Sequence, residues 1–596
     1  MLIPLASLAI GCFILSLTLL TYIGLPLLKN IPVLFKLKSQ PYFGLGSSLI
    51  SLTLMLGIIG YFGYIDGQML RTLRFVMGGG GIILMTFPVA ERLKYSEKFG
   101  KYIAPYLNIK TGLTFISIIT LFSIFLISFF DGNYGGDGYM YHLPFAARIW
   151  GIISPEQYTF EDYTEHRFLG FPLLANALQG FFWKIFQRPE ATNLVCFSSL
   201  IILITYLTNS LKIPFYLATI SLLAIPMVHM HAARSYIDLP GNVCVSILIL
   251  TTYLLYINKI SFNNKTLLII FLSAASAANI KFQLIPVVFI ILCFIFPQII
   301  SKYWKPDGNA KTGLIRLIKV LSISFLATLV IFVTPIRNIL VYHNPFYPVK
   351  IEIAGHIFNH NEAPPDFMHA NLRKLPPTLR WAKSVLEINA FDKRRPWPWT
   401  LAMDFISWDE EAFGIGGYFG GYVIFNLLLF IYLCWKIHNH ESKIAIFLMV
   451  IMTGLTSIMP QSYELRYYMY WMIVFVSLNA YLISQHLNYF SENKLINSQN
   501  FALVATGFML VFILQTDKFF TIPKFEPLSR YIQGNVQTEI LDKIKDGEKV
   551  CLVGKTPHSF FYSSYFHPSR NYSLKSEFEI SPKYSTQKCK GRTLIR

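Results

Sequence analysis

Residues 112–137 read GLTFISIITLFSIFLISFF followed by DGNYGGD, an unbroken apolar run that ends in a polar, glycine-rich stretch. A helix needs about 20 mostly apolar residues to cross the hydrocarbon core of a bilayer. Inside that core every backbone amide must be bonded within its own segment, so a run of this length predicts a helix. We therefore expect residues 112–130 to span a membrane and Asp131 to open a loop on one side of it.

Apolar runs of the same kind recur along most of the 596-residue chain, of which 54% is hydrophobic and only 14% is charged. An ordinary soluble domain carries about 25% charged residues. We predict an all-α polytopic membrane protein with about 14 transmembrane helices. The expected spans are 2–24, 43–64, 73–90, 112–130, 191–209, 213–230, 239–257, 264–280, 283–300, 315–335, 413–436, 443–459, 467–486 and 500–516.

The formal net charge of +19 comes largely from basic residues in short loops between the apolar runs, for example at 29–38 and 92–110. Lys and Arg accumulate in cytoplasmic loops of membrane proteins. This distribution excludes nucleic acid as the expected partner and predicts contact with membrane lipids instead. It also places the N-terminus and the loop from Asp131 outside, which in a bacterial inner membrane is the periplasmic side.

The apolar segment 169–187 decides the topology of everything downstream, and it is short and broken by Pro172 and Asn176. If it spans the membrane, the basic cluster at 302–319 faces outward. If it lies along the interface or re-enters, that cluster falls inside, as the distribution of basic residues favours. We expect the second arrangement, with interfacial helices in the first outer loop. The outward-facing polar segments are then 131–190, 338–412 and 517–596.

The chain therefore divides into accessory N-terminal transmembrane helices (1–111), a transmembrane core (112–516) and an extracytoplasmic C-terminal segment (517–596). In the C-terminal segment, residues 549–554 alternate in the manner of a strand, which predicts a small α/β segment. Cys551 and Cys589 both lie there. Outside the cytoplasm they could form a disulfide, and the sequence leaves that question open.

Ionisable residues gather at the predicted outer ends of several helices. Such groups are costly at membrane depth and usually face a cavity or a partner. Taken singly, an Arg at a helix end is more often an interfacial anchor, and an Asp in a glycine-rich turn often only caps that turn. Their common placement predicts one shared outward site. Its candidate members are Asp137, Tyr141, His142, Glu165, Arg167, Arg234, Asp238, Lys281, Arg337 and Arg466.

These residue types suit transfer of a sugar from a lipid-linked phosphate. A carboxylate can act as general base on an acceptor hydroxyl. Lys and Arg can hold a phosphate and stabilise the charge that it gains as a leaving group. A site embedded in the membrane is expected if the donor is itself a lipid. The sequence thus predicts a transferase that uses a polyprenyl-phosphate sugar.

The stretch Asp137-x-x-x-Tyr141-His142-Leu143-Pro144, directly after a predicted span, is similar to the first-loop signature of GT-C type integral membrane glycosyltransferases. The group in question is the RgtA/B/C/D-like one, related to protein O-mannosyltransferases and aminoarabinose transferases. Further landmarks follow in the same order over residues 112–480. They are Phe171-Pro172-Leu173, Ala233-Arg234 to Asp238, the break at Lys281, Arg337-Asn338 with Asn344 to Pro348, and Arg466-Tyr467-Tyr468.

The resemblance implies a GT-C fold and an inverting transferase whose catalytic base is Asp137. It implies that Tyr141, His142, Glu165 and Asp238 shape the acceptor site. Arg167, Arg234, Lys281, Arg337 and Arg466 would bind the donor phosphate. The acceptor would be lipopolysaccharide, another glycan, a lipid or a protein. Gly138 stands where many relatives carry a second acidic residue, so a divalent metal is not supported and no cofactor is assigned.

Two other functions fit a polytopic chain with charged helix ends. A transporter or flippase for lipid-linked saccharides should show symmetry between its two halves, and the sequence shows none. A polymerase or ligase of lipid-linked glycans would concentrate its function in a large late outer loop, which here is 338–412. The charged run Asp392-Lys-Arg-Arg395 in that loop is more typical of a solvated stretch or one that contacts headgroups. A purely structural membrane protein would leave the residues of the first outer loop unexplained, so the transferase is favoured.

Overall fold

The computed structural model describes residues 109–132, 136–303, 310–363, 374–387, 417–486, 496–515, 523–555, 558–578 and 587–596. The first three predicted spans, and with them the predicted accessory N-terminal helices, lie outside these ranges.

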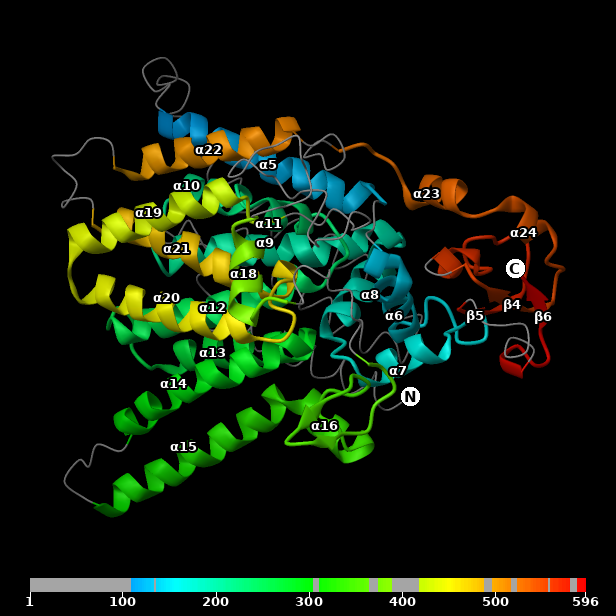
Figure 1. Cartoon of the computed structure of the whole chain (residues 1–596), viewed down its shortest axis with the longest axis horizontal. Coiled ribbons are helices and arrows are strands. Elements are labelled where there is room, and N and C mark those ends of the chain that lie inside the picture. The colour runs from blue at the N-terminus through cyan, green and yellow to red at the C-terminus, as the bar shows by residue number, and fades with distance from the viewer. Residues whose placement is uncertain are drawn as a thin grey trace, which may run out of the picture.

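The described part of the chain is mostly helical, and its long helices lie side by side in one bundle (Figure 1). They are α5 (Ile109–Phe130), α9 (Leu194–Asn209), α12 (Asp238–Tyr256), α13 (Asn264–Ile280), α14 (Ile285–Tyr303), α15 (Ala310–Ile331), α19 (Gly420–Ile437), α20 (His440–Ile458), α21 (Tyr470–Gln485) and α22 (Ser498–Gln515).

Six helical segments of the described residues are long and apolar enough to cross a membrane. They are 109–130, 189–209, 238–256, 282–301, 420–437 and 440–458. Each coincides with a predicted span to within a few residues, except that the predicted span at 413–436 begins before the described helix. The chain thus has the character of an all-α membrane protein, and the total of about 14 spans stays a prediction.

The centre of the bundle is formed by α12 and α21, whose residues are almost all buried. At the periphery, α5, α19 and α20 expose large apolar side chains such as Phe115, Leu428 and Phe447. A helix that is apolar on all sides is either inside a core or in contact with lipid. The central helices fit the first description and the peripheral helices fit the second.

Two predicted spans are not single helices. The span at 213–230 is divided into α10 (Phe215–Leu223) and α11 (Pro226–His231). Pro226 has no N–H to donate and disfavours helix in the residue before it, so the chain breaks there. The span at 315–335 is divided at Phe332, where α16 (Val333–Tyr342) turns by 68° from the preceding helix. Arg337 therefore lies inside α16 and does not close the longer helix.

The first outer loop folds into short elements against one end of the bundle. They are η4 (Gly138–His142, a π-helical turn), α6 (Leu143–Ile149), β1 (Tyr158–Thr159), α7 (Asp162–Gly170), α8 (Leu174–Phe186) and η5 (Pro189–Asn193). Helix α8, inside the ambiguous segment 169–187, has 13 residues and is not among the helices long enough to span. It packs on α6 at Gly180, where an added Cβ would lie 2.4 Å from the carbonyl oxygen of Ala146.

The remaining short elements of the bundle lie at helix ends and in the second large loop. They are η6 (Phe282–Leu284), the hairpin of β2 (Glu352–Ile353) and β3 (His356–Ile357), α18 (Pro377–Val385) and η7 (Leu465–Tyr468). Of these, η6 directly precedes α14, and η7 directly precedes the buried helix α21.

The C-terminal segment lies at one end of the bundle beside α6 and α7 (Figure 1). It contains α23 (Leu528–Asn535), α24 (Thr538–Asp542), β4 (Lys549–Val553), η9 (His558–Tyr562), β5 (Ser573–Glu577) and β6 (Thr593–Ile595). The strand predicted at 549–554 is β4. The sheet order is β1-β5-β4-β6 with all pairs parallel. Because β1 belongs to the first outer loop, that loop and the C-terminal segment share one sheet.

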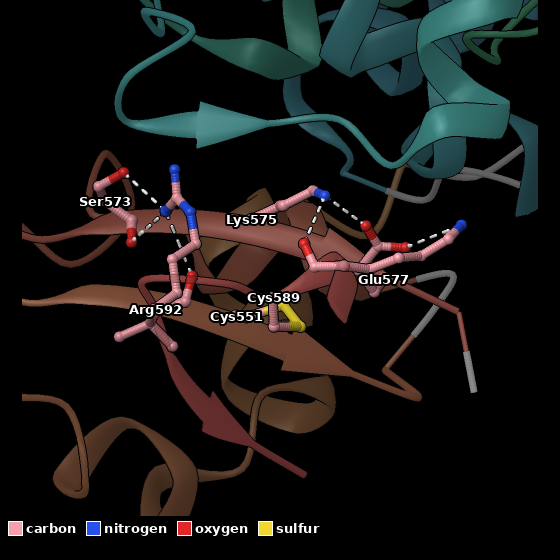
Figure 2. The surroundings of a disulfide bond; sticks show 8 residues. Cys551, Ser573, Lys575, Glu577, Cys589 and Arg592 are labelled. Carbon is pink, nitrogen blue, oxygen red and sulfur yellow. Dashed lines mark hydrogen bonds and ion pairs between the residues drawn. A yellow bond between two sulfur atoms is a disulfide. The ribbon is translucent and has the colours of Figure 1, made fainter. Parts of the chain in front are cut away.

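The disulfide that the sequence left open is present between Cys551 on β4 and Cys589 just before β6, with Cα atoms 5.6 Å apart (Figure 2). Both cysteines are buried. Beside them, Arg592 donates to Ser573 (Figure 2). The disulfide thus crosslinks the centre of the sheet to the chain that leads into its edge strand.

Candidate functional site

Two residues far apart in sequence meet at the end of the bundle nearest the first outer loop. The Nη1 of Arg466, in η7, lies 2.7 Å from the carboxylate of Asp137, which directly precedes η4. The guanidinium also donates to the hydroxyl of Tyr467 at 3.3 Å. Its buried Nε has no hydrogen-bond partner. The base and one of the cations predicted from the sequence are therefore in direct contact.

A second ion pair lies beside the first. The ammonium of Lys281, at the break between α13 and η6, pairs with Asp238. Asp238 is the first residue of α12, where a negative charge is favoured by the helix dipole. The Lys281 nitrogen lies 3.9 Å from the centre of the Tyr467 ring, and the Arg466 guanidinium carbon lies 5.0 Å from it. The Tyr467 ring thus joins the two ion pairs into one cluster.

Asn242 fixes the position of η7 over the start of α12. Its side chain lies one helical turn after Asp238 and is fully buried. The amide donates to the backbone carbonyl of Arg466 at 3.2 Å, and its oxygen accepts from the backbone N–H of Tyr470 at 2.9 Å. Sequence reasoning missed Asn242, although two polar residues four apart at the head of an apolar helix were a usable signal.

His142 and Tyr141 form the side of the site that belongs to the first outer loop. The Nδ1 of His142 is 3.1 Å from the amide nitrogen of Asn176 on α8, and the two rings of Tyr141 and His142 lie 4.3 Å apart. Burial lowers the pKa of His142 to about 4, although Asp137 and Asp238 act in the opposite direction. The imidazole is therefore neutral near pH 7. Burial also raises the pKa of Tyr141 well above its ordinary value.

The carboxyl groups of the cluster differ in their electrostatic state. Burial by itself would raise the pKa of Asp137, but the charge and hydrogen bond of Arg466 lower it to about 2. Glu464, which precedes η7, has its pKa raised, chiefly by burial. The cluster therefore contains the Asp137 carboxylate paired with the Arg466 cation, the Lys281 cation paired with the buried Asp238, and a neutral imidazole. Such a set can bind a phosphate and accept a proton.

Arg167 makes a different contact from the one predicted. Its guanidinium pairs with Glu362 of the second large loop, with Nε 2.9 Å from one carboxylate oxygen, and it also donates to Tyr163. Glu362 is buried. Arg167 borders the cluster, since it lies 5.2 Å from the centre of the Tyr141 ring. Through Nε and Nη2 it connects the two outer loops, and its predicted role as a phosphate ligand stays a prediction.

Two other predicted residues contact other parts of the chain, and a third, Arg234, is close enough to Tyr236 for their charges to interact. Arg337 donates to the carbonyl oxygens of Leu169 and Gly170 and so joins α16 to the end of α7. Glu165 pairs with Arg148 at 2.5 Å. Arg234 lies in the turn between α11 and α12. The structure thus brings together Asp137, Tyr141, His142, Asp238, Lys281 and Arg466 of the predicted set.

Asp131, the other aspartate of the quoted sequence, has a structural role. Its two carboxylate oxygens accept from the backbone N–H groups of Lys524 and Glu526, each at 3.0 Å. Its side chain is buried. The carboxylate therefore attaches the C-terminal segment to the end of α5, and it is not available for chemistry.

An apolar pocket lies among the long helices, further along the bundle than the cluster. It lies between α12, α14 and α20 and ends at Tyr470, the residue whose N–H is held by Asn242. Its lining includes Ile249, Tyr253, Ile291, Phe294, Leu448 and Met452. On α12 it is lined from Ile249 to Tyr256, in the half of that helix that is away from Asp238.

Among the described residues, no three His, Cys, Asp or Glu side chains are grouped as metal ligands. Comparisons with protein-family models, with curated proteins and with solved structures found no match to this chain. The functional argument therefore depends on the site itself.

Proposed function

We propose that the protein is a membrane glycosyltransferase that moves a sugar from a polyprenyl-phosphate donor to an acceptor outside the membrane, with inversion. The observation that carries this proposal is the pairing of Asp137 with Arg466 and of Asp238 with Lys281 around one tyrosine ring. The proposed general base and the two proposed phosphate-binding cations come from three separate parts of the chain.

The donor phosphate would bind at Arg466 and Lys281. The unpartnered Nε of Arg466 offers a donor that the protein itself does not use. As the sugar leaves, the lipid phosphate gains a negative charge, and preorganised cations in a water-poor site stabilise that charge strongly. The apolar pocket between α12, α14 and α20 would take a later part of the lipid chain, because it is lined by apolar side chains and approaches the start of α21 at Tyr470.

The transfer itself would use Asp137 as base. The acceptor hydroxyl gives its proton to the carboxylate while its oxygen attacks the anomeric carbon of the sugar. The bond from that carbon to the phosphate oxygen breaks, and its electron pair stays on the phosphate. A carboxylate with a pKa of about 2 is a weak base. When the donor phosphate engages Arg466, the hold of Arg466 on Asp137 weakens and the pKa of Asp137 rises toward its ordinary range.

The site would face the periplasm of a bacterial cell from the inner membrane. Two observations support that side. The distribution of basic residues places the loop from Asp131 outside. The disulfide between Cys551 and Cys589, in a segment that contacts the same loop, is typical of an oxidising compartment.

Mass analysis of cell-surface glycans tests the proposal. We expect Asp137→Asn to remove one sugar from one class of surface glycan while the protein is still expressed and inserted. Asp542→Asn, whose carboxylate is 70% exposed and paired with Arg570 at 2.9 Å, is the matched control and should leave the glycans unchanged. Intact glycans in the Asp137→Asn strain would refute transfer. Altered uptake or altered sidedness of lipid-linked saccharides in that strain would favour a transporter or flippase.

A further inference from the structure

Four aromatic rings join the π-helical turn η4 to the C-terminal segment. The ring of Tyr139, in η4, stacks on His558 with the ring centres 4.9 Å apart. It also lies 5.8 Å from the ring centres of both Tyr531 and Phe561. The hydroxyl of Tyr531 is 3.2 Å from Nε2 of His558. We call Tyr139, Tyr531, His558 and Phe561 the aromatic clamp.

The clamp holds an element that is weak by itself. Single π-helical turns are rare and occur mostly at functional sites. Here the turn is five residues long and Asp137 directly precedes it. Any rotation of η4 would move the Asp137 carboxylate relative to Arg466. Tyr139 is 7% exposed, so its ring is the anchor that fixes this rotation.

The C-terminal segment is attached to the chain on both sides of η4. Before the turn, Asp131 accepts from the backbone of Lys524 and Glu526, and the N–H of Gly132 donates to the carbonyl of Glu526 at 2.8 Å. After the turn, β1 pairs with β5. The hydroxyl of Tyr158 in β1 lies 3.0 Å from that of Ser559. The C-terminal segment is therefore attached to the first outer loop both before and after Asp137.

The disulfide fixes the strand from which the clamp extends. Cys551 lies in the middle of β4, and His558 follows that strand in η9. Phe561 belongs to the same short helix. The Cys551–Cys589 bond thus restricts the part of the sheet that presents two of the four rings.

We propose that the C-terminal segment is a positioning unit for the catalytic loop: through the aromatic clamp it sets the orientation of Asp137 toward Arg466, with His558 and Tyr531 as positioning residues. This inference rests on the proposed transferase function. It adds that the disulfide is needed for full turnover, because the disulfide holds the sheet that carries the clamp.

The test measures transfer by purified protein in lipid nanodiscs, with lipid-linked donor extracted from the host membrane. Tyr139→Leu should lower kcat by roughly tenfold, which corresponds to about 1.4 kcal/mol in the barrier, and leave the donor KM within about twofold. Tyr139→Phe keeps the stacked ring and should restore kcat. A purely structural loss would reduce the amount of folded protein and would not separate kcat from KM.

Tyr565→Leu is the matched control. Tyr565 also joins the C-terminal segment to the first outer loop, through Trp183 on α8 at a ring distance of 5.9 Å and a hydrogen bond of 3.3 Å, but it belongs to a different contact from the clamp. Its replacement should cost similar stability and leave kcat unchanged. His558→Leu is a second test variant, which should lower kcat as Tyr139→Leu does. The double variant Cys551→Ser with Cys589→Ser should lower kcat in the same direction.

Each outcome decides between the hypotheses. If the wild-type protein transfers sugar and both Tyr139→Leu and His558→Leu keep the kcat of Tyr565→Leu, the positioning role is overturned. If Tyr139→Leu does not fold, the kcat of His558→Leu alone decides. If the wild-type protein transfers no sugar from any lipid-linked donor, the proposed function fails first, and that result is distinct from the loss of positioning.

Discussion

At the scale of single residues, the two aspartates of segment 131–137 have different partners: backbone N–H groups bind Asp131, and Arg466 binds Asp137. The sequence indicated Asp137, Lys281 and Arg466 because charged groups at the ends of apolar helices usually face a cavity or a partner. It could not show that the Asp131 carboxylate accepts hydrogen bonds from backbone N–H groups some 393 residues later, or that Arg167 pairs with Glu362. Such partners come from tertiary packing, and no local pattern encodes them.

Glu161 carries a prediction about pH. It is buried, one carboxylate oxygen accepts from Thr164 at 2.9 Å and the other has no partner. Burial raises the pKa of Glu161 from 4.5 to about 7. Glu577 acts in the same direction, and Thr164, Arg167 and Lys588 act against it. Since the folded pKa is above the unfolded one, the stabilising contribution of the protonated group is complete below pH 4.5 and is lost as pH rises through 7.

Replacing Glu161 by Gln should therefore flatten the pH dependence of stability. Between pH 5 and pH 8 the wild-type protein should lose up to about 3 kcal/mol more than Glu161→Gln does. Thermal unfolding of both proteins in detergent at the two pH values measures this difference. Asp162→Asn, with a carboxylate 61% exposed, is the control and should keep the wild-type slope. Equal slopes for wild type and Glu161→Gln would contradict the assigned pKa.

At the scale of elements, the apolar runs predicted where helices lie because helix formation in lipid is a local requirement. They did not predict the break at Pro226 or the turn at Phe332, since a run of apolar residues looks continuous whether or not its helix does. The sequence also did not predict the packing of α6 on α8. It depends on Gly180, and a glycine inside a helical pattern has no unique meaning.

Gly180→Ala should disrupt the packing of α6 on α8. The new Cβ would lie 2.3 Å from Trp150 Cδ1 and 2.4 Å from the Ala146 carbonyl oxygen, and overpacking of this kind typically costs about 1–3 kcal/mol. Gly454→Ala in α20 meets nothing within 4 Å and should be neutral or stabilising by up to about 1 kcal/mol. Thermal unfolding of Gly180→Ala, Gly454→Ala and the wild-type protein measures this difference. An equal shift of the unfolding temperature for both variants would exclude the close contact at Gly180.

At the scale of the whole molecule, charged groups mark both ends of the central helix. Asp238 begins α12 within the ion-pair cluster. Beyond its other end, Lys259 pairs with Glu441 at 2.8 Å, and Glu441 also pairs with His486. A helix of 19 residues is about 29 Å long, which is close to the thickness of the hydrocarbon core. The site and the Lys259 pair therefore lie at opposite ends of a helix long enough to cross that core, and charge counting along the sequence predicts that they face opposite sides of the membrane.

This geometry predicts which side each segment faces. In a background where Cys12 and the four free cysteines of the described residues are replaced by Ala and the disulfide is kept, Lys545→Cys in the C-terminal segment should react with a membrane-impermeant maleimide in intact spheroplasts. Asn264→Cys, at the start of α13 and on the side of Lys259, should react only after permeabilisation; both positions are exposed. The C-terminal segment must share the side of Asp137, because Asp131 holds its backbone. Labelling of Asn264→Cys alone in intact spheroplasts would reverse the orientation of the site and place the proposed transfer in the cytoplasm.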